Sequence, residues 1–105
     1  MTEIVLVYST FSTEAEAVSV AQALLSEKLI ACANITPMRA LYRWEGKLHN
    51  EPEASMIVKT ATHRLAEVML RIKALHSYDV PCIVAYPITD GHGPFIDWIK
   101  AETLV

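Results

Sequence analysis

The segment ACANITPMRALYRWEGKL, residues 31–48, decides the fold because it contains a strand that is long for a chain of 105 residues. Residues 31–35 form a mainly apolar run typical of a strand, and Pro37 is expected to interrupt its hydrogen-bond ladder. Residues 40–44 resume the strand pattern, in which Ala40, Tyr42 and Trp44 alternate with Leu41 and Arg43. The pattern ends at the dipeptide Glu45-Gly46, which predicts a hairpin turn.

The length of this strand conflicts with the size of the domain. At about 3.3 Å per residue, the segment from 31 to 44 would span roughly 46 Å if straight. A chain of about 100 residues has a radius of gyration near 13 Å. We therefore expect the hairpin tip with Tyr42 and Trp44 to project beyond its own core, where a neighbouring subunit would cover the rings. The alternative is a hairpin that Pro37 and Pro52 bend back over the free sheet face.

The first third of the chain predicts a strand followed by a helix. Residues 4–9 are apolar and β-branched, as in a buried strand. Thr13 predicts the N-cap of the helix, and Glu16 is placed to reach back and complete a capping box. One face of this helix is apolar, with Ala17, Val20, Ala21 and Leu24 at helical spacing.

The remaining elements complete a recognisable order. A return strand over residues 48–60 is broken by Pro52, a second helix covers 62–76, and a short strand covers 83–86. Pro94 suits the first turn of a last helix. The apolar face of the second helix consists of Leu65, Val68, Met69, Ile72 and Leu75, and the last helix carries Phe95, Trp98 and Ile99. This order predicts an α+β fold, the ferredoxin-like split βαβ arrangement with a C-terminal helix and an antiparallel sheet.

Composition limits the class of protein. The length predicts one domain over residues 1–105, and 52% hydrophobic with 20% charged residues is typical of a globular chain. A net charge of −3 without a basic cluster argues against nucleic-acid binding. Neither a signal peptide nor a membrane span is visible, so we expect a cytoplasmic protein without membrane contact. Cys32 and Cys82 are isolated and are expected to remain thiols there.

Several motifs in order make the chain resemble the CutA family of divalent-cation-tolerance proteins. They are ACANITP (31–37), LYRWEGKL (41–48), KT (59–60), HSYDVP (76–81), PITDG (87–91) and WI (98–99). The resemblance implies a ferredoxin-like subunit that assembles as a homotrimer through long intersubunit strands, similar in architecture to PII signalling proteins. It also implies a role in the response to divalent cations, copper foremost.

The chain departs from the family pattern at three positions. Cys82 follows the VP pair where the family usually has glutamate, Phe95 stands where tyrosine is common, and Ala40 replaces a common serine. These changes make the expected cleft less polar. A thiol does not replace a carboxylate, but it offers a soft ligand to copper or zinc.

Candidate metal ligands are His76, Cys82, Cys32 and Glu53, which would bind Cu²⁺ or another divalent cation in a cleft between subunits. Each has a structural alternative. His76 can instead bond the end of its helix, and Cys32 can be a small core residue. No close pair such as HxH or CxxC supports chelation within one segment. No organic cofactor is implied.

The expected ligand cleft or interface consists of Tyr42, Trp44, Lys59, Tyr78 and Trp98. An alternative function uses the same trimer as a PII-like sensor or scaffold, with a small metabolite or anion held between Lys59, Arg43 and the aromatic pair. No GxSxG, HExxH or phosphate-binding glycine loop occurs, so we expect a protein that is not an enzyme.

Overall fold

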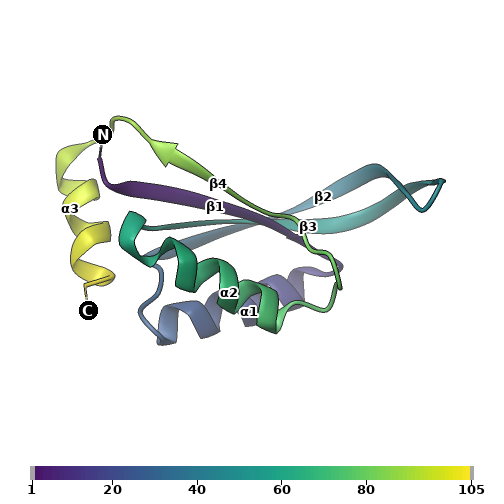
Figure 1. Cartoon of the computed structure of the whole chain (residues 1–105), viewed down its shortest axis with the longest axis horizontal. Coiled ribbons are helices and arrows are strands. Elements are labelled where there is room, and N and C mark those ends of the chain that lie inside the picture. The colour runs from purple at the N-terminus through teal and green to yellow at the C-terminus, as the bar shows by residue number, and fades with distance from the viewer. Residues whose placement is uncertain (1, 105) are drawn as a thin grey trace.

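The computed structural model describes residues 2–104 and has the predicted ferredoxin-like topology. Its four strands form one antiparallel sheet in the order β2-β3-β1-β4. Helices α1 and α2 cover one face of the sheet, and α3 lies across one end (Figure 1). The elements in chain order are β1 Ile4–Phe11, α1 Glu14–Ser26, β2 Cys32–Trp44, β3 Lys47–Ala61, a 3-10 turn Thr62–Arg64, α2 Leu65–Leu75, β4 Ile83–Ile88 and α3 Gly93–Glu102.

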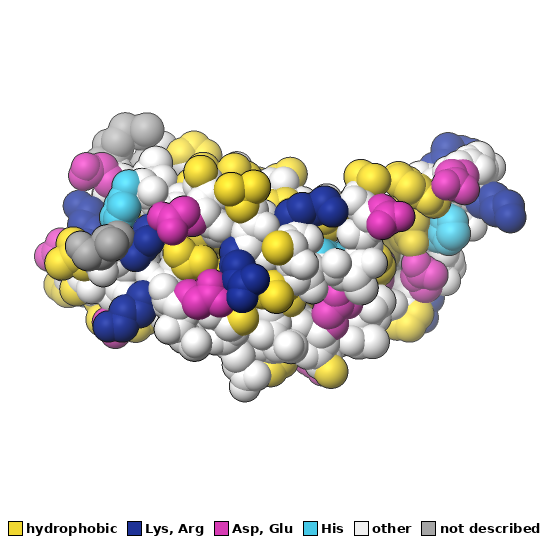
Figure 2. Space-filling view, turned by 60° about the horizontal axis from the view of Figure 1, so that its bottom comes forward, with side chains coloured by type: hydrophobic (Ala, Val, Ile, Leu, Met, Phe, Trp, Pro, Cys, Tyr) yellow, Lys and Arg dark blue, Asp and Glu magenta, His cyan; other side chains and the backbone are white. Residues whose placement is uncertain are grey.

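The β2-β3 hairpin projects from the body of the molecule (Figure 1). Strand β1 pairs with β3 only as far as Phe11 opposite Ala54, whereas β2 and β3 stay paired out to Trp44 opposite Lys47. We call residues 38–53 the hairpin arm. The molecule measures 44 × 26 × 21 Å, so the arm extends its long axis and does not fold back over the sheet. Figure 2 shows hydrophobic, acidic, basic and histidine side chains next to one another on the arm.

The two prolines do not interrupt their strands, contrary to the sequence prediction. Pro37 pairs with Ala54 and Pro52 pairs with Arg39 within continuous strands. Strand β2 is an edge strand, and at Pro52 strand β3 has a neighbour on one side only. A missing N–H that faces the open side removes no ladder bond, which is how edge positions tolerate proline.

The tip of the arm is the predicted two-residue turn. Glu45 has φ 50° and Gly46 has φ 77°, so both residues lie in the left-handed region. Two successive positive φ values define the turn that matches the twist of a tight hairpin, and glycine adopts this conformation without a steric cost.

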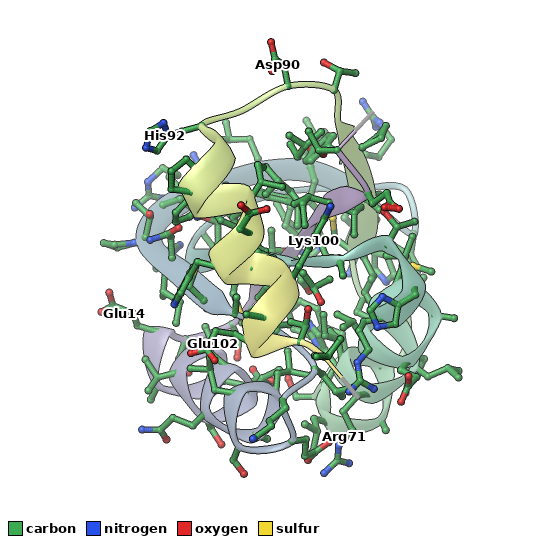
Figure 3. All side chains as sticks on the ribbon, turned by 90° about the vertical axis from the view of Figure 1, so that its left-hand side faces the viewer. Glu14, Arg71, Asp90, His92, Lys100 and Glu102 are labelled. Atoms are coloured by element: carbon green, nitrogen blue, oxygen red, sulfur yellow. The ribbon has the colours of Figure 1, made fainter. Side chains whose placement is uncertain are left out.

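Helix α3 covers the end of the sheet opposite the arm. Its buried Ile99 packs with Ile4 and Ala31 in a small second cluster, which confirms the predicted last helix with Pro94 in its first turn. Figure 3 looks onto this end, where Lys100 and Glu102 lie on the helix and Asp90 lies on the loop before it. The Lys100 ammonium lies 3.9 Å from the Glu3 carboxylate.

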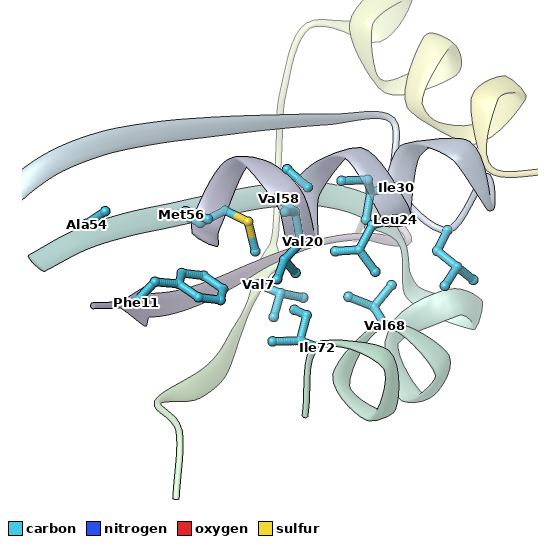
Figure 4. Close-up of a cluster of buried hydrophobic side chains, with 13 residues drawn as sticks. Val7, Phe11, Val20, Leu24, Ile30, Ala54, Met56, Val58, Val68 and Ile72 are labelled. Atoms are coloured by element: carbon cyan, nitrogen blue, oxygen red, sulfur yellow. The ribbon is translucent and has the colours of Figure 1, made fainter. Parts of the chain in front are cut away.

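The main core lies between the sheet and the two helices on its face (Figure 4). Both apolar helix faces that the sequence predicts contribute to it. Its buried members are Val7, Phe11, Ala17, Val20, Ala21, Leu24, Leu29, Ile30, Ala54, Met56, Val58, Val68 and Ile72. The opposite sheet face carries no helix over the middle of the strands (Figure 1).

The cap of α1 is only half of the predicted capping box. Thr13 accepts a hydrogen bond from the backbone N–H of Glu16 at 3.1 Å, as expected. The Glu16 carboxylate does not return a bond to Thr13. It accepts instead from the Ser12 hydroxyl at 3.1 Å and from Ser77, which follows α2.

Candidate functional site

The candidate site lies where the loop after α2, residues 76–82, meets the base of the hairpin arm. The Tyr78 hydroxyl donates to the Glu53 carboxylate oxygen Oε2 at 2.7 Å. Burial raises the pKa of Tyr78 well above its usual range, and the bond to Glu53 adds to the increase. Two residues that the sequence singled out separately are therefore in direct contact.

The loop is fixed at its start by Glu16. The carboxylate accepts from the Ser77 backbone N–H at 2.9 Å and from the Ser77 hydroxyl at 3.0 Å. Burial raises the pKa of Glu16, but the hydrogen bonds from Ser77 and Ser12 outweigh it, so the net pKa is lowered. Hydrogen bonds that stabilise the charged form of a carboxylate lower its pKa.

His76 uses both ring nitrogens inside its own protomer. Nε2 lies 2.7 Å from the carbonyl oxygen of Thr10, and Nδ1 accepts from the backbone N–H of Tyr78 at 3.1 Å. A carbonyl only accepts and a backbone N–H only donates, so this pattern assigns a neutral ring with its proton on Nε2. The side chain is 0% exposed and stacks on Phe11, with ring centroids 4.4 Å apart. In this arrangement His76 has no free lone pair for a metal, unlike the predicted ligand.

Cys82 is an exposed thiol just before β4. Partial burial of the sulfur raises the pKa of Cys82, and the negative charge of Glu53 raises it further. Burial likewise raises the pKa of Tyr8, followed by the charges of Cys82, Tyr86 and Glu53. Cys82, Glu53 and Tyr8 therefore share one electrostatic environment near the base of the arm.

A second contact between a phenol and a carboxylate lies further along the arm. The Tyr42 hydroxyl donates to Glu51, and the Tyr42 ring stacks on His49 with centroids 4.8 Å apart. The bond to Glu51 raises the pKa of Tyr42 to about 12. Trp44, near the tip, is half-exposed.

The other candidate residues lie elsewhere. Cys32 pairs with Lys59, whose ammonium donates to Asn34 on the uncovered sheet face. From the strand register, Cys32 and Cys82 are separated by three strand spacings and about four residues, or roughly 20 Å. Trp98 lies against Phe95 on α3, with ring centroids 5.5 Å apart, at the end of the molecule opposite the arm (Figure 1).

Residues 2–104 contain no group of three His, Cys, Asp or Glu side chains that could hold a metal ion. Within the same range, no helix is long and apolar enough to cross a membrane. The predicted metal ligands therefore do not converge within one protomer.

The sequence did not reveal the roles that two residues of the site, Glu16 and Thr10, have in the structure. Glu16 bonds Ser77 across 61 positions, and Thr10 bonds His76 across 66 positions. The capping pattern drew attention to Glu16 but predicted a local partner. Thr10 gave no signal, because it acts through its backbone carbonyl.

Comparisons with known proteins identify the same family over nearly the whole chain. Residues 5–102 match the family model of the CutA1 divalent ion tolerance protein. The divalent-cation tolerance protein CutA of Thermus thermophilus is 42% identical over 104 residues, which cover 98% of this chain and 99% of the relative. The protein of the same description from Archaeoglobus fulgidus is 46% identical over 93 residues, or 89% of this chain and 91% of the relative.

Solved structures of proteins from this family have the same fold as this chain. The Archaeoglobus fulgidus structure, described as a periplasmic divalent cation tolerance protein, superposes with a TM-score of 0.93 at 43% identity over 95% of this chain and 98% of that one. The structure of divalent ion tolerance protein CutA1 from Ehrlichia chaffeensis gives a TM-score of 0.94 at 36% identity, covering 100% of this chain and 99% of that one.

Proposed function

Since the chain belongs to the CutA1 divalent ion tolerance family, we propose that it acts as a homotrimer that binds divalent cations, copper foremost, at the seams between protomers. The proposal places the protein in the cytoplasm and assigns it a binding role without an enzymatic reaction. The family description names tolerance of divalent ions, which supports a role toward such cations.

The hairpin arm supports assembly. A two-stranded ribbon is marginally stable alone in water, and this one exposes large apolar side chains, with Leu41 70% and Leu48 75% exposed. A sister protomer that pairs with the ribbon would cover these side chains together with Tyr42 and Trp44. Three protomers is the number that the family resemblance implies.

The Glu53 carboxylate is the observation that carries the cation proposal. Its Oε2 is held by Tyr78, whereas its Oε1 accepts no hydrogen bond from any residue between 2 and 104. A carboxylate with one fixed and one open oxygen can bind a divalent cation. Since no protomer gathers three ligands in its described part, the remaining ligands would come from a neighbouring chain.

Cys82 is the second proposed ligand because its thiol is exposed and lies in the same electrostatic environment as Glu53. A soft sulfur would favour copper over magnesium or calcium. Cys32 would join such a site only from another protomer, given its roughly 20 Å separation from Cys82 in the strand register. His76 is left out of the ligand set because both of its nitrogens are used.

Two measurements test this function. Sedimentation velocity should give a particle of about 35 kDa, three times the 11.7 kDa chain, and a particle of one chain mass would contradict the assembly. Calorimetric titration with Cu²⁺ and Zn²⁺ should show saturable binding that Glu53→Gln removes and Cys82→Ser weakens. Glu102→Gln, on α3 far from the arm, is the matched control. Saturable binding of a small anion with no cation binding would instead favour the PII-like alternative.

A further inference from the structure

We propose that Tyr78 and His76 are positioning residues for cation binding by Glu53: they hold its carboxylate in place, and neither touches the cation. This inference rests on the proposed function, since it assigns a role at the same site. It differs from the ligand set expected from the sequence, because it moves His76 from the metal to the structure that supports the metal ligand.

The first step is the contact between Tyr78 and Glu53. A hydrogen bond of 2.7 Å to Oε2 fixes the rotation of the carboxylate and leaves Oε1 as the atom that can face a cation. Carboxylates that bind metals are commonly oriented by such a donor, and loss of the donor typically lowers metal affinity about 10–100-fold. Tyr78 therefore acts on the cation through Glu53.

The second step is the contact between His76 and the backbone of Tyr78. His76 Nδ1 accepts the Tyr78 N–H at 3.1 Å, while Nε2 binds the Thr10 carbonyl at 2.7 Å. These two bonds and the stacking on Phe11 fix the ring on both sides. The result is a continuous series of contacts from the end of β1, through a buried ring, to the carboxylate on the arm.

The third step is the contrast with Tyr42. Its hydroxyl also donates to a glutamate on β3, Glu51, but Tyr42 and Glu51 both belong to the arm. The ring stacks on His49, another arm residue. Tyr78 instead comes from the loop after α2 and ties the arm to the body, so of these two phenols Tyr78 is the one that can position a glutamate of the arm relative to the body.

The first experiment is calorimetric titration of the full chain with Zn²⁺ alone. Tyr78→Phe keeps the ring and removes the hydroxyl, and should raise the Kd about 10–100-fold. Tyr86→Phe, on β4, removes an exposed hydroxyl that forms no hydrogen bond with residues 2–104 and should leave the Kd within about twofold of the wild type, a change that corresponds to under 0.5 kcal/mol. Unchanged affinity in Tyr78→Phe, or an equal loss in Tyr86→Phe, overturns the role of Tyr78.

The second experiment is 15N NMR of the His76 ring in the wild type, which requires no destabilised variant. We expect a neutral ring with its proton on Nε2, and both nitrogen signals should keep their positions when Zn²⁺ saturates the protein. A large shift of either signal on zinc addition would make His76 a ligand and overturn the inference.

Variants of His76 separate positioning from a general loss of structure. His76→Asn retains an acceptor close to the Nδ1 position for the Tyr78 N–H, whereas His76→Ala retains none. Zinc affinity should fall in His76→Ala and recover in part in His76→Asn, and equal loss in both would contradict positioning. If the wild type binds no zinc in the first experiment, the proposed function fails as well. Failure of this inference alone leaves wild-type binding intact.

Discussion

The carboxylate of Glu16 accepts a hydrogen bond from the backbone N–H of Ser77 at 2.9 Å, and this contact joins the first turn of α1 to the loop after α2. The same carboxylate also accepts from the Ser77 and Ser12 hydroxyls. The charged form of Glu16 is therefore favoured in the folded protein, and its pKa lies below the ordinary value of 4.5.

A pH dependence of stability follows from this lowered pKa. The contribution of Glu16 is fully present above about 4.5, its unfolded value, and is lost as the pH falls through the lower folded value. We expect Glu16→Gln to reduce the free energy of unfolding at neutral pH, with a gap to the wild type that closes in acid. Urea denaturation across pH at one protomer concentration measures this gap, with the exposed Glu14→Gln as the control. A gap that widens in acid would contradict the assignment.

Two buried hydroxyls should respond to removal with opposite signs. Ser9 Oγ is buried without a hydrogen-bond partner among residues 2–104, whereas Thr60 donates to the Leu29 carbonyl at 2.6 Å. Ser9→Ala should raise the free energy of unfolding by about 1 kcal/mol, and Thr60→Val should lower it by about 1–3 kcal/mol. Denaturant titration of both variants at equal protomer concentration provides the test. A loss of stability in Ser9→Ala would indicate an unrecognised partner for its hydroxyl.

A residue just after the end of α1 has an unfavourable backbone conformation. Lys28 has φ 59°, and the next residue, Leu29, donates its N–H to the Leu24 carbonyl at 3.0 Å, as in a helix end that favours glycine. Lys28→Gly should stabilise the protein by on the order of 1 kcal/mol, because glycine adopts positive φ without strain. Lys73→Gly inside α2 is the control and should cost about 1 kcal/mol. Thermal unfolding of both variants distinguishes the conformational effect from loss of a lysine charge.

Glu53 should also control the reactivity of Cys82. Burial raises the pKa of this thiol, and the carboxylate raises it further by opposing the thiolate charge. In a Cys32→Ser background without metal, Glu53→Gln should therefore increase the rate of alkylation by iodoacetamide at a fixed, mildly alkaline pH. Glu51→Gln is the neighbouring control and should have a smaller effect. An alkylation rate that is unchanged in Glu53→Gln would show that the Glu53 carboxylate does not act on the Cys82 thiol.

The fold could be predicted because its determinants are local. The apolar faces of α1 and α2, the Glu45-Gly46 turn and Pro94 at the start of α3 each depend on residues close in sequence. Strand length was sufficient to predict the projecting arm. Pro37 and Pro52 were misinterpreted as interruptions because their effect depends on whether a strand has neighbours on both sides, which is a property of the assembled sheet.

The site was predicted less well, for a physical reason. Glu53 and Tyr78 were both singled out, but their contact joins positions 25 residues apart and depends on how the loop crosses the arm. His76 lies at the end of α2, as predicted, but its ring contacts neither the carbonyls of that helix end nor a metal: its partners are a backbone carbonyl of β1 and a backbone N–H of its own loop. Backbone partners carry no side-chain signature, so no residue pattern indicates which atoms of the ring are occupied.

The arm has a consequence for how such proteins diverge. None of residues 38–53 belongs to either hydrophobic cluster, so the body can close its core within one chain. In the proposed trimer, substitutions along the ribbon would change which chains recognise one another without disturbing the residues that fold each body. Two paralogues made in the same cell would then sort into separate assemblies by ribbon sequence, even with interchangeable bodies.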